Sequence, residues 1–340
     1  MGIKDVSMKH ILRNLLGAKK PTIPQHSGHE THPEITDHPL LSIIVIVYDM
    51  PKQAFKTLFS LSTAYQHQAI AEEYEIIVVE NRSTHLLNKD DVEAIDTNIR
   101  YFLREETEPT PVHAINFGVT QAKGNLVAII IDGARMATPG LIKNILLANK
   151  LSTNPVICVP GYHLGHKLQA QSALEGYDNA AEEILLSSIK WPDDGYRLFD
   201  IACLGGSLKD GFFLPMAESN CLAIKKSLFT ELEGYHPSFN SHGGGYANLD
   251  MYRRACEHSG TELIVLFGEG TFHQIHGGVT TGGSQQNRKA LLDELTSQYK
   301  SIRQRDYEVP YKPATYLGNL SKPAMHFVGF SAQKALEILT

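Results

Sequence analysis

The chain has 340 residues, of which 42% are hydrophobic, and this is enough to bury the core of one large domain or two ordinary ones. Its 31 basic and 37 acidic residues give a formal net charge of -6, so it lacks the overall positive field by which proteins hold nucleic acids. These values exclude a largely disordered chain and predict no nucleic-acid partner.

The cysteines indicate a reducing compartment. None of the four forms a CxxC pair, which argues against a zinc ribbon or a dense disulfide framework; they are Cys158, Cys203, Cys221 and Cys256. No apolar run approaches the roughly 20 residues that span a bilayer, and the first residues lack the apolar core of a secretory signal peptide. We therefore expect a cytoplasmic protein.

Residues 1–38 are predicted to be an amphipathic helix followed by a linker. The first 20 residues place apolar side chains among basic ones at helical spacing, and residues 21–38 are rich in Pro, His and Thr without apolar periodicity. One interpretation is a helix that packs on its own domain or on a second subunit. The other is peripheral contact with the inner face of a membrane through residues 1–20.

The organised part of the chain starts at residue 39 with alternating strands and helices. Residues 41–48 (LSIIVIVY) form an apolar, β-branched run typical of a strand that is buried on both faces, and a helix pattern begins at Pro51. Further strands are predicted at 73–80, 99–104 and 125–132, with a helix at 112–122. This alternation favours an α/β fold with a doubly wound, mostly parallel sheet and helices on both faces.

Two of these strands end in a carboxylate. Glu80 closes EYEIIVVE and Asp132 closes NLVAIIID. Ligands of doubly wound sheets bind at the carboxyl ends of the strands, so Glu80, Asp132 and the turn after Tyr48 are predicted to share a site. The alternative for each acid alone is an exit into solvent or a helix cap.

Five segments in order resemble the family-2 glycosyltransferases and their GT-A relatives. They are IVIVYDMPKQAFKTLFSL, EIIVVENRST, AINFGVTQAKGNLVAIIIDGARM, ESNCLAIKKSLFTELEGYHPSF and HGGGYANLDMYRRACEHSG, and the resemblance covers about two thirds of the chain. It implies a GT-A fold and transfer of a sugar from a nucleotide-sugar donor to a glycan or lipid-linked acceptor. The expected reaction is an inverting transfer in cell-surface polysaccharide or glycoconjugate synthesis.

The resemblance also implies a set of donor-binding residues. Tyr48 and its neighbours would line the base pocket, Glu80 would accept from the base or ribose, and Asn116 would shape a loop around the nucleotide. The full set is Val47, Tyr48, Glu80, Arg82, Asn116, Asp132, Gly133 and Arg135.

The sequence departs from the family at the DXD motif. Asp132 matches the first acid of that motif, but Ala134 and Arg135 follow it in IDGAR. A departing nucleoside diphosphate needs a divalent cation or fixed positive side chains. Either Mn²⁺ or Mg²⁺ is held by Asp132 with His273 or His276 of GTFHQIHGG, or Arg135 binds the phosphate directly.

An acceptor hydroxyl needs a carboxylate to take its proton. Asp250 is the first candidate, because it follows a glycine-rich turn at 243–245 and precedes the helical run MYRRA. In an alignment shifted by two residues Asn248 takes that position, and Asp250 is then an acid in the first turn of a helix. Glu218, in the ESN turn, is the second catalytic candidate and would contact sugar or acceptor.

Three segments are expected: 1–38, the glycosyltransferase domain 39–283 and a helical C-terminal extension 284–340. The domain divides into a nucleotide-binding half, 39–135, and an acceptor half, 136–283. The extension is compatible with a lid, an acceptor platform or a contact in a homo-oligomer.

A dinucleotide-dependent oxidoreductase is disfavoured because no GxGxxG follows the first strand. A noncatalytic GT-A domain that binds glycan or nucleotide, or acts as a scaffold, stays open because the DXD motif is incomplete.

Overall fold

The computed structural model describes residues 40–106, 108–276 and 285–339. The chain divides into residues 1–37 and 38–340, and the description below concerns the second unit. The predicted N-terminal helix and linker, and the predicted boundary after Gly283, lie outside the described residues. Among the described helices, none has the length and hydropathy that crossing a membrane requires.

The larger sheet is built from strands that come from the whole length of the domain, from Leu41 to Tyr316. Its strands are β1 Leu41–Val47, β2 Tyr74–Asn81, β3 Ile99–Arg104, β4 Leu126–Ile130, β6 Pro155–Cys158, β9 Cys221–Lys225, β10 Glu262–Val265 and β12 Ala314–Tyr316. They lie in the order β12-β10-β6-β9-β4-β1-β2-β3. Only β9 runs antiparallel to its neighbours, β4 and β6. The prediction of a doubly wound, mostly parallel sheet is confirmed.

Strand β1 lies at the centre of the domain because it is buried along its whole length. All seven of its residues are buried, and it pairs in parallel with β2 and β4, as its unbroken apolar run predicts. Its one hydroxyl, Ser42 Oγ, donates to Glu75 Oε1 at 2.7 Å. Because Val47 pairs with Glu80 and Val45 pairs with Ile130, the carboxyl ends of β1, β2 and β4 meet at one edge.

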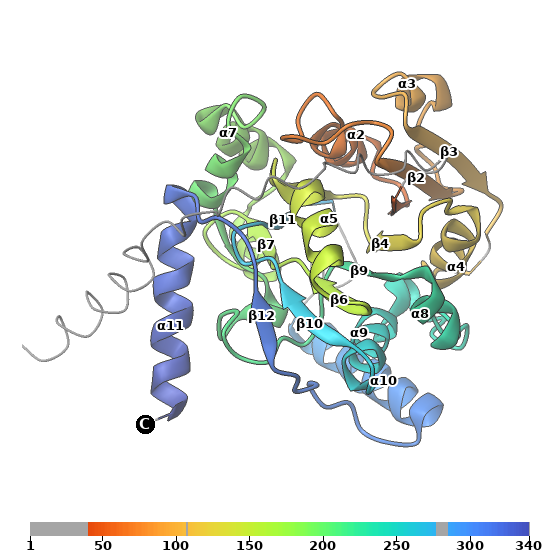
Figure 1. Ribbon diagram of the computed structural model, residues 1–340, viewed down its shortest axis with the longest axis vertical. Coiled ribbons are helices and arrows are strands. Elements are labelled where there is room, and N and C mark those ends of the chain that lie inside the picture. The colour runs from red at the N-terminus through yellow and green to blue at the C-terminus, as the bar shows by residue number, and fades with distance from the viewer. Residues whose placement is uncertain (1–39, 107, 277–284, 340) are drawn as a thin grey trace, which may run out of the picture. The chain divides into compact units, whose positions relative to one another are not determined.

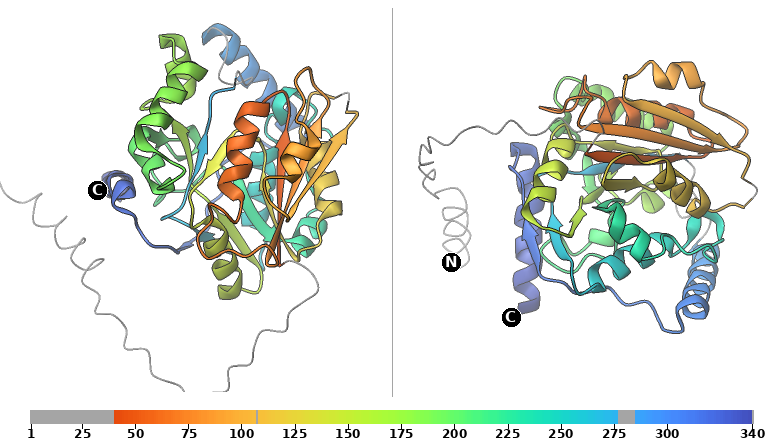
Figure 2. Two further views of the ribbon diagram at one scale, coloured as in Figure 1. Left: turned by 90° about the horizontal axis from the view of Figure 1, so that it is seen from above. Right: turned by 45° about the vertical axis from the view of Figure 1, so that its right-hand side comes forward.

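Helices cover both faces of this sheet (Figures 1 and 2). The principal ones are α2 Pro51–Leu61, α4 Val112–Gln121, α5 Leu141–Leu151, α8 Lys226–Glu231 and α9 Ala247–Glu257. Alternate residues of β1 face two separate cores: Ile44 and Ile46 pack with α4, α8 and α9, while Ile43 and Val45 pack with α2 and α5.

The remaining elements lie around these layers. They are α3 Lys89–Glu93, α6 Gln169–Ser172, α7 Asn179–Ile189, α10 Gln285–Arg303 and α11 Met325–Leu339, with 3-10 turns η1 Ala173–Glu175, η2 Gly195–Ile201, η3 Gly206–Leu208, η4 His242–Gly244 and η5 Lys322–Ala324. Strand β12, from the predicted C-terminal extension, pairs with β10 and forms an edge of the larger sheet, and α11 stands beside that edge (Figure 1).

A second, smaller sheet was not expected from the sequence. It contains β5 Arg135–Ala137, β7 Gly161–Leu164, β8 Ala202–Leu204 and β11 Thr271–His273, in the order β5-β11-β7-β8. Each strand has only three or four residues, which is too short for a clear hydrophobic pattern. The small sheet matters for function because it pairs His273 with Arg135 across β11 and β5.

Candidate functional site

The turn after β4 positions Asp132. The strand ends at Ile130, two residues earlier than predicted, and Asp132 Oδ1 accepts a hydrogen bond from the Ala134 backbone N–H at 2.8 Å. At Gly133 a Cβ atom would lie 2.8 Å from Val47 Cγ2 and 3.1 Å from the Ile46 carbonyl oxygen. Glycine thus lets the turn pack against the end of β1, while the Asp132 side chain keeps 22% exposure.

Three further side chains converge on this carboxylate. Asp132 Oδ2 lies 2.9 Å from His273 Nε2, 3.9 Å from His276 Nε2 and 3.4 Å from Arg135 Nη2. The two imidazole Nε2 atoms are 3.1 Å apart. Pairing of β5 with β11 causes this convergence, since it sets His273 beside Arg135 just after the Asp132 turn.

Burial and nearby charges together set the protonation states of Asp132 and His273. Burial by itself would raise the pKa of Asp132, but at the acidic pH where this carboxylate would take a proton, the positive charges of His273, Arg135 and His276 hold that pKa well below its usual range. Burial lowers the pKa of His273, and the Asp132 charge offsets this only in part. At neutral pH the cluster therefore offers an anionic oxygen beside a neutral imidazole.

The donor set fits a divalent cation. The ligand atoms of Asp132, His273 and His276 all lie within 4.8 Å of one another, and no other group of three such residues was found in the described part of the chain. One carboxylate with two imidazoles suits a first-row transition ion. Arg135 borders the cluster with its side chain 9% exposed, and its Nε is buried without a hydrogen-bond partner. The site can hold a cation and present a guanidinium to an anion.

Glu218 lies at the same edge of the larger sheet. Cys221, the first residue of β9, pairs with Ile130, the last residue of β4, and Glu218 precedes it by three residues. Asn248, in the first turn of α9, donates through Nδ2 to Glu218 Oε2 at 2.6 Å and to the Ser219 carbonyl oxygen at 3.2 Å. Asn248 Oδ1 accepts from the Tyr235 hydroxyl at 3.0 Å, so its carboxamide is held from both ends.

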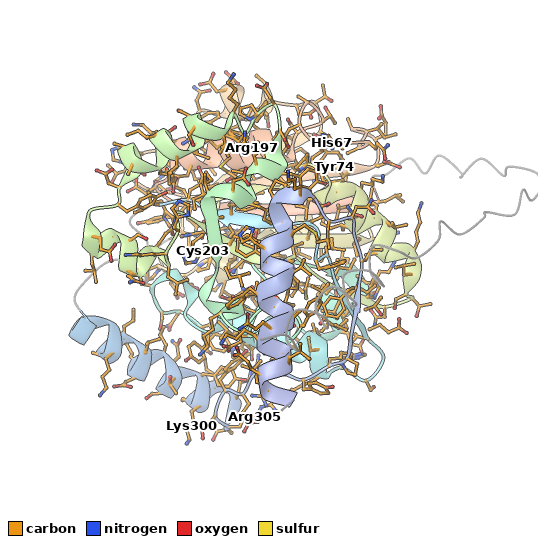
Figure 3. All side chains as sticks on the ribbon, turned by 90° about the vertical axis from the view of Figure 1, so that its left-hand side faces the viewer. His67, Tyr74, Arg197, Cys203, Lys300 and Arg305 are labelled. Carbon is orange, nitrogen blue, oxygen red and sulfur yellow. The ribbon has the colours of Figure 1, made fainter. Side chains whose placement is uncertain are left out.

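Asp250 lies two residues after Asn248, in the same first turn of α9, and is enclosed by two arginines. Its side chain is 1% exposed; Oδ1 accepts from Arg303 Nε at 2.7 Å, and Oδ2 accepts from Arg303 Nη2 at 2.7 Å and Arg254 Nε at 2.8 Å. These contacts give Asp250 a packing role between α9 and α10. Arg305 supports the same junction through Glu257 at 2.7 Å, and Figure 3 shows Arg305 near Lys300 at this end of α10.

Of the predicted base-pocket residues, Tyr48 is exposed to solvent and Val47 is buried. Tyr48 is 50% exposed, whereas Val47 and Glu80 are fully buried. The Glu80 carboxylate accepts from the Tyr101 hydroxyl at 2.5 Å and from the Leu87 N–H at 3.1 Å, so it holds the loop after β2. Burial, opposed by these hydrogen bonds, raises the pKa of Glu80.

Two other donor-binding candidates have partners within the chain. Arg82 pairs with Glu105 on the surface. The Asn116 carboxamide donates to the Tyr235 carbonyl oxygen at 2.8 Å and accepts from the Tyr235 N–H at 3.0 Å. Asn116 thus joins α4 to the loop after α8.

Three residues that hold the histidine segment were not among the site residues predicted from the sequence. Gln169 contacts both the backbone and the ring of His273, Glu182 accepts from the Ile275 N–H at 2.8 Å, and Gln53 donates to the Ile275 carbonyl oxygen at 2.8 Å. All three are buried polar residues. Their burial could not be inferred locally, because their partners are more than 90 residues away in the chain.

No family model matches the chain, and no curated protein matches it. Solved structures do match. TarS from S. aureus is 12% identical with a TM-score of 0.49, over 77% of this chain and 44% of TarS. TarS 1–349 in complex with UDP-GlcNAc is 13% identical with a TM-score of 0.47, over 87% of this chain and 71% of that one.

The mannosyltransferase PcManGT from Pyrobaculum calidifontis, in complex with GDP-Man and Mn²⁺, is 15% identical with a TM-score of 0.44, over 97% of this chain and 77% of that one. The match to TarS covers 44% of the length of that protein, so this chain spans less than half of it. Identities and TM-scores this low leave activity and substrate to be argued from the site itself.

Proposed function

We propose that this chain is a nucleotide-sugar-dependent glycosyltransferase with a GT-A fold, which transfers a sugar to a hydroxyl of a glycan or lipid-linked acceptor. The observation that carries the proposal is the Asp132, His273 and His276 cluster, bordered by Arg135, at the carboxyl end of β4. Doubly wound sheets bind their ligands at this edge. The five sequence segments that resemble family-2 glycosyltransferases support the same conclusion.

In this proposal Asp132, His273 and His276 hold a divalent cation. When bound, the cation neutralises the charge that develops on the departing diphosphate. Two imidazole nitrogens beside one carboxylate favour Mn²⁺ over Mg²⁺, which prefers an all-oxygen shell. The low pKa of Asp132 keeps its carboxylate anionic, as a ligand must be.

Arg135 is proposed to contact the same diphosphate. Its side chain is 9% exposed beside Asp132, and its Nε–H has no hydrogen-bond partner, so this guanidinium has donor capacity left for an anion. A planar guanidinium matches two phosphate oxygens. Its positive charge would add to the neutralisation of the diphosphate, which compensates for a cation held without the second acid that the IDGAR segment lacks.

Glu218 is proposed as the base that takes the acceptor proton. Its carboxylate is partly exposed at the same sheet edge, and the Asn248 amide orients one of its oxygens. Asp250 has both oxygens engaged by guanidinium groups and is almost fully buried. In an inverting transfer Glu218 would take the proton of the acceptor hydroxyl, while the hydroxyl oxygen bonds to the sugar and the nucleoside diphosphate leaves.

The test is an assay of transfer and of donor hydrolysis with a panel of UDP- and GDP-sugars. We expect chelation by EDTA to suppress turnover and Mn²⁺ to restore it, and we expect Asp132→Asn to abolish it. Arg135→Ala should lower turnover less than loss of the cation does, and Arg135→Lys should restore only part of it, because a point charge cannot reproduce the planar fork. Full activity in EDTA with both histidines replaced by alanine would overturn the cation assignment.

A second candidate function is a noncatalytic domain that binds nucleotide sugar or glycan. The observation that favours it is the enclosure by two arginines of Asp250, the first candidate for the base in the sequence. The two functions are separated by measuring donor binding and turnover on the same preparation. Saturable binding of a nucleotide sugar with no hydrolysis and no transfer under any cation would favour the binding module.

A further inference from the structure

Gln169 makes two contacts with one metal-ligand candidate. It is fully buried at the start of α6, outside the motifs that suggested the site. Its Nε2 donates to the His273 carbonyl oxygen at 2.8 Å, and its Oε1 contacts His273 Nδ1 in a short hydrogen bond. One carboxamide therefore holds both the backbone and the ring of the same histidine.

The carbonyl contact determines which way this carboxamide faces. A backbone carbonyl oxygen only accepts, so the group facing it must be the NH₂ of Gln169. Oε1 then faces His273 Nδ1, and because Oε1 also only accepts, Nδ1 must carry the ring proton. In the neutral ring this leaves the lone pair on Nε2, the atom 2.9 Å from Asp132 Oδ2.

Gln169 is itself held in register with His273. Its backbone N–H donates to His163 Nδ1 at 3.1 Å, and His163 pairs with His273 across β7 and β11. The His163 and His273 rings are 5.4 Å apart. The short helix is thus fastened to the neighbouring strand at the level of the ligand, which fixes the carboxamide relative to the ring.

We propose that Gln169 is a positioning residue for the cation site, which selects the Nδ1–H tautomer of His273 and aims Nε2 at the cation. This inference rests on the proposed function, since it assigns a role within the cation site of that reaction. Histidine ligands commonly donate their second ring N–H to an acceptor, and loss of such a partner typically weakens metal affinity by about 10- to 100-fold.

The experiment measures Mn²⁺ binding to chelator-treated protein by the EPR signal of free Mn²⁺. We expect Gln169→Leu to raise the Kd for Mn²⁺ by about 10- to 100-fold. Gln169→Glu keeps an acceptor for Nδ1–H and should lose less affinity. Gln66→Leu is the matched control, because Gln66 is also buried and donates to two carbonyl oxygens, those of Ser60 and Thr138. It should leave the Kd unchanged.

A second readout does not depend on metal. In ¹⁵N-labelled, metal-free wild-type protein we expect the His273 ring to be protonated on Nδ1, and we expect Gln169→Leu to lose that preference. An unchanged Kd in Gln169→Leu, a wild-type His273 ring protonated on Nε2, or a wild-type chain that does not bind Mn²⁺ would each overturn the proposal. If Mn²⁺ binding depends on Gln169 but no nucleotide sugar is ever turned over, the glycosyltransferase function fails and the role of Gln169 stands.

Discussion

Glu218 and Asp250, the two candidate bases, differ in their exposure to solvent and in their partners. Glu218 is partly exposed and has Asn248 as its partner, whereas Asp250 is buried between Arg254 and Arg303. A general base must be free to take a proton, which requires an open oxygen. The alignment in which Asn248 replaces the family's acid agrees better with these contacts than the one that makes Asp250 the base.

We predict that Glu218→Gln lowers kcat by about two to four orders of magnitude, the usual contribution of a general base, while the Kd for the donor changes little. Single-turnover kinetics at saturating donor measure this. Asn248→Ala should reduce kcat less severely, because it removes the group that orients Glu218 and leaves the carboxylate.

Asp250→Asn should behave differently. It leaves two guanidinium groups without their anion in a poorly exposed place, and we expect it to lower the free energy of unfolding by about 3 kcal/mol. Urea unfolding measures the stability, and kcat is measured on the folded protein. A steep loss of kcat in Asp250→Asn at wild-type stability would restore Asp250 as the base.

Helix α7 contributes a buried acid that holds the histidine segment. Asp178 caps the helix by accepting from the Ala181 N–H at 2.9 Å, and Glu182 follows in the first turn with 2% exposure. Glu182 accepts from the Ile275 N–H, between His273 and His276. Burial raises the pKa of Glu182 from 4.5 to about 7, although its hydrogen bonds and Lys56 oppose the shift.

This raised pKa predicts a pH-dependent stability. The folded chain binds the Glu182 proton more tightly than the unfolded chain does, so the stabilising contribution is complete below pH 4.5 and is lost as the pH rises through about 7. We expect the free energy of unfolding of the wild-type chain to fall by about 1 to 3 kcal/mol between pH 4.5 and pH 8 because of Glu182. Glu182→Gln keeps an acceptor for the Ile275 N–H, does not titrate, and should not show this fall. Urea unfolding across this range measures it.

Glu183→Gln is the control for that series, because the Glu183 side chain is 57% exposed on the same helix. It should leave most of the pH dependence of the wild-type chain in place, because burial is the main cause of the raised pKa of Glu182 and the Glu183 charge is the smallest. If Glu182→Gln and the wild-type chain lose stability in parallel from pH 4.5 to pH 8, Glu182 is not the group that titrates.

The candidate site lies where the two sheets meet. Asp132 is in the turn between β4 of the larger sheet and β5 of the smaller one, and His273 ends β11 of the smaller sheet. A cation held by both would bind only the folded arrangement. Binding to the native state alone stabilises the whole domain by mass action.

We therefore predict that Mn²⁺ at about 100 times its Kd stabilises the wild-type chain by about 2.7 kcal/mol, seen as a rise in Tm. Asp132→Asn should show no such rise. Mg²⁺ at the same concentration should give a smaller one, because the site offers two nitrogens. An equal rise in Asp132→Asn would place the bound ion elsewhere in the molecule.

The strands of the central sheet were predictable because their signal is local. Residues 41–47 are apolar and β-branched without a break, and the structure pairs them on both sides. The carboxylate at the end of β4 was found for the same reason. Pairing of His273 and His276 with Asp132 came from resemblance to a family, since His273 lies 141 positions after Asp132 in the chain.

The sequence by itself therefore determined the strands at 41–48, 73–80, 99–104 and 125–132, the helices that follow the first and the third of them, and which strand ends carry acids, because hydrophobic periodicity is a property of neighbouring residues. Only the tertiary structure decided that Asp250 is enclosed by Arg254 and Arg303 and that Gln169 contacts the ring of His273. These contacts join segments of the chain that are far apart, through strands of three or four residues and single side-chain hydrogen bonds. No local pattern of residues encodes such pairings.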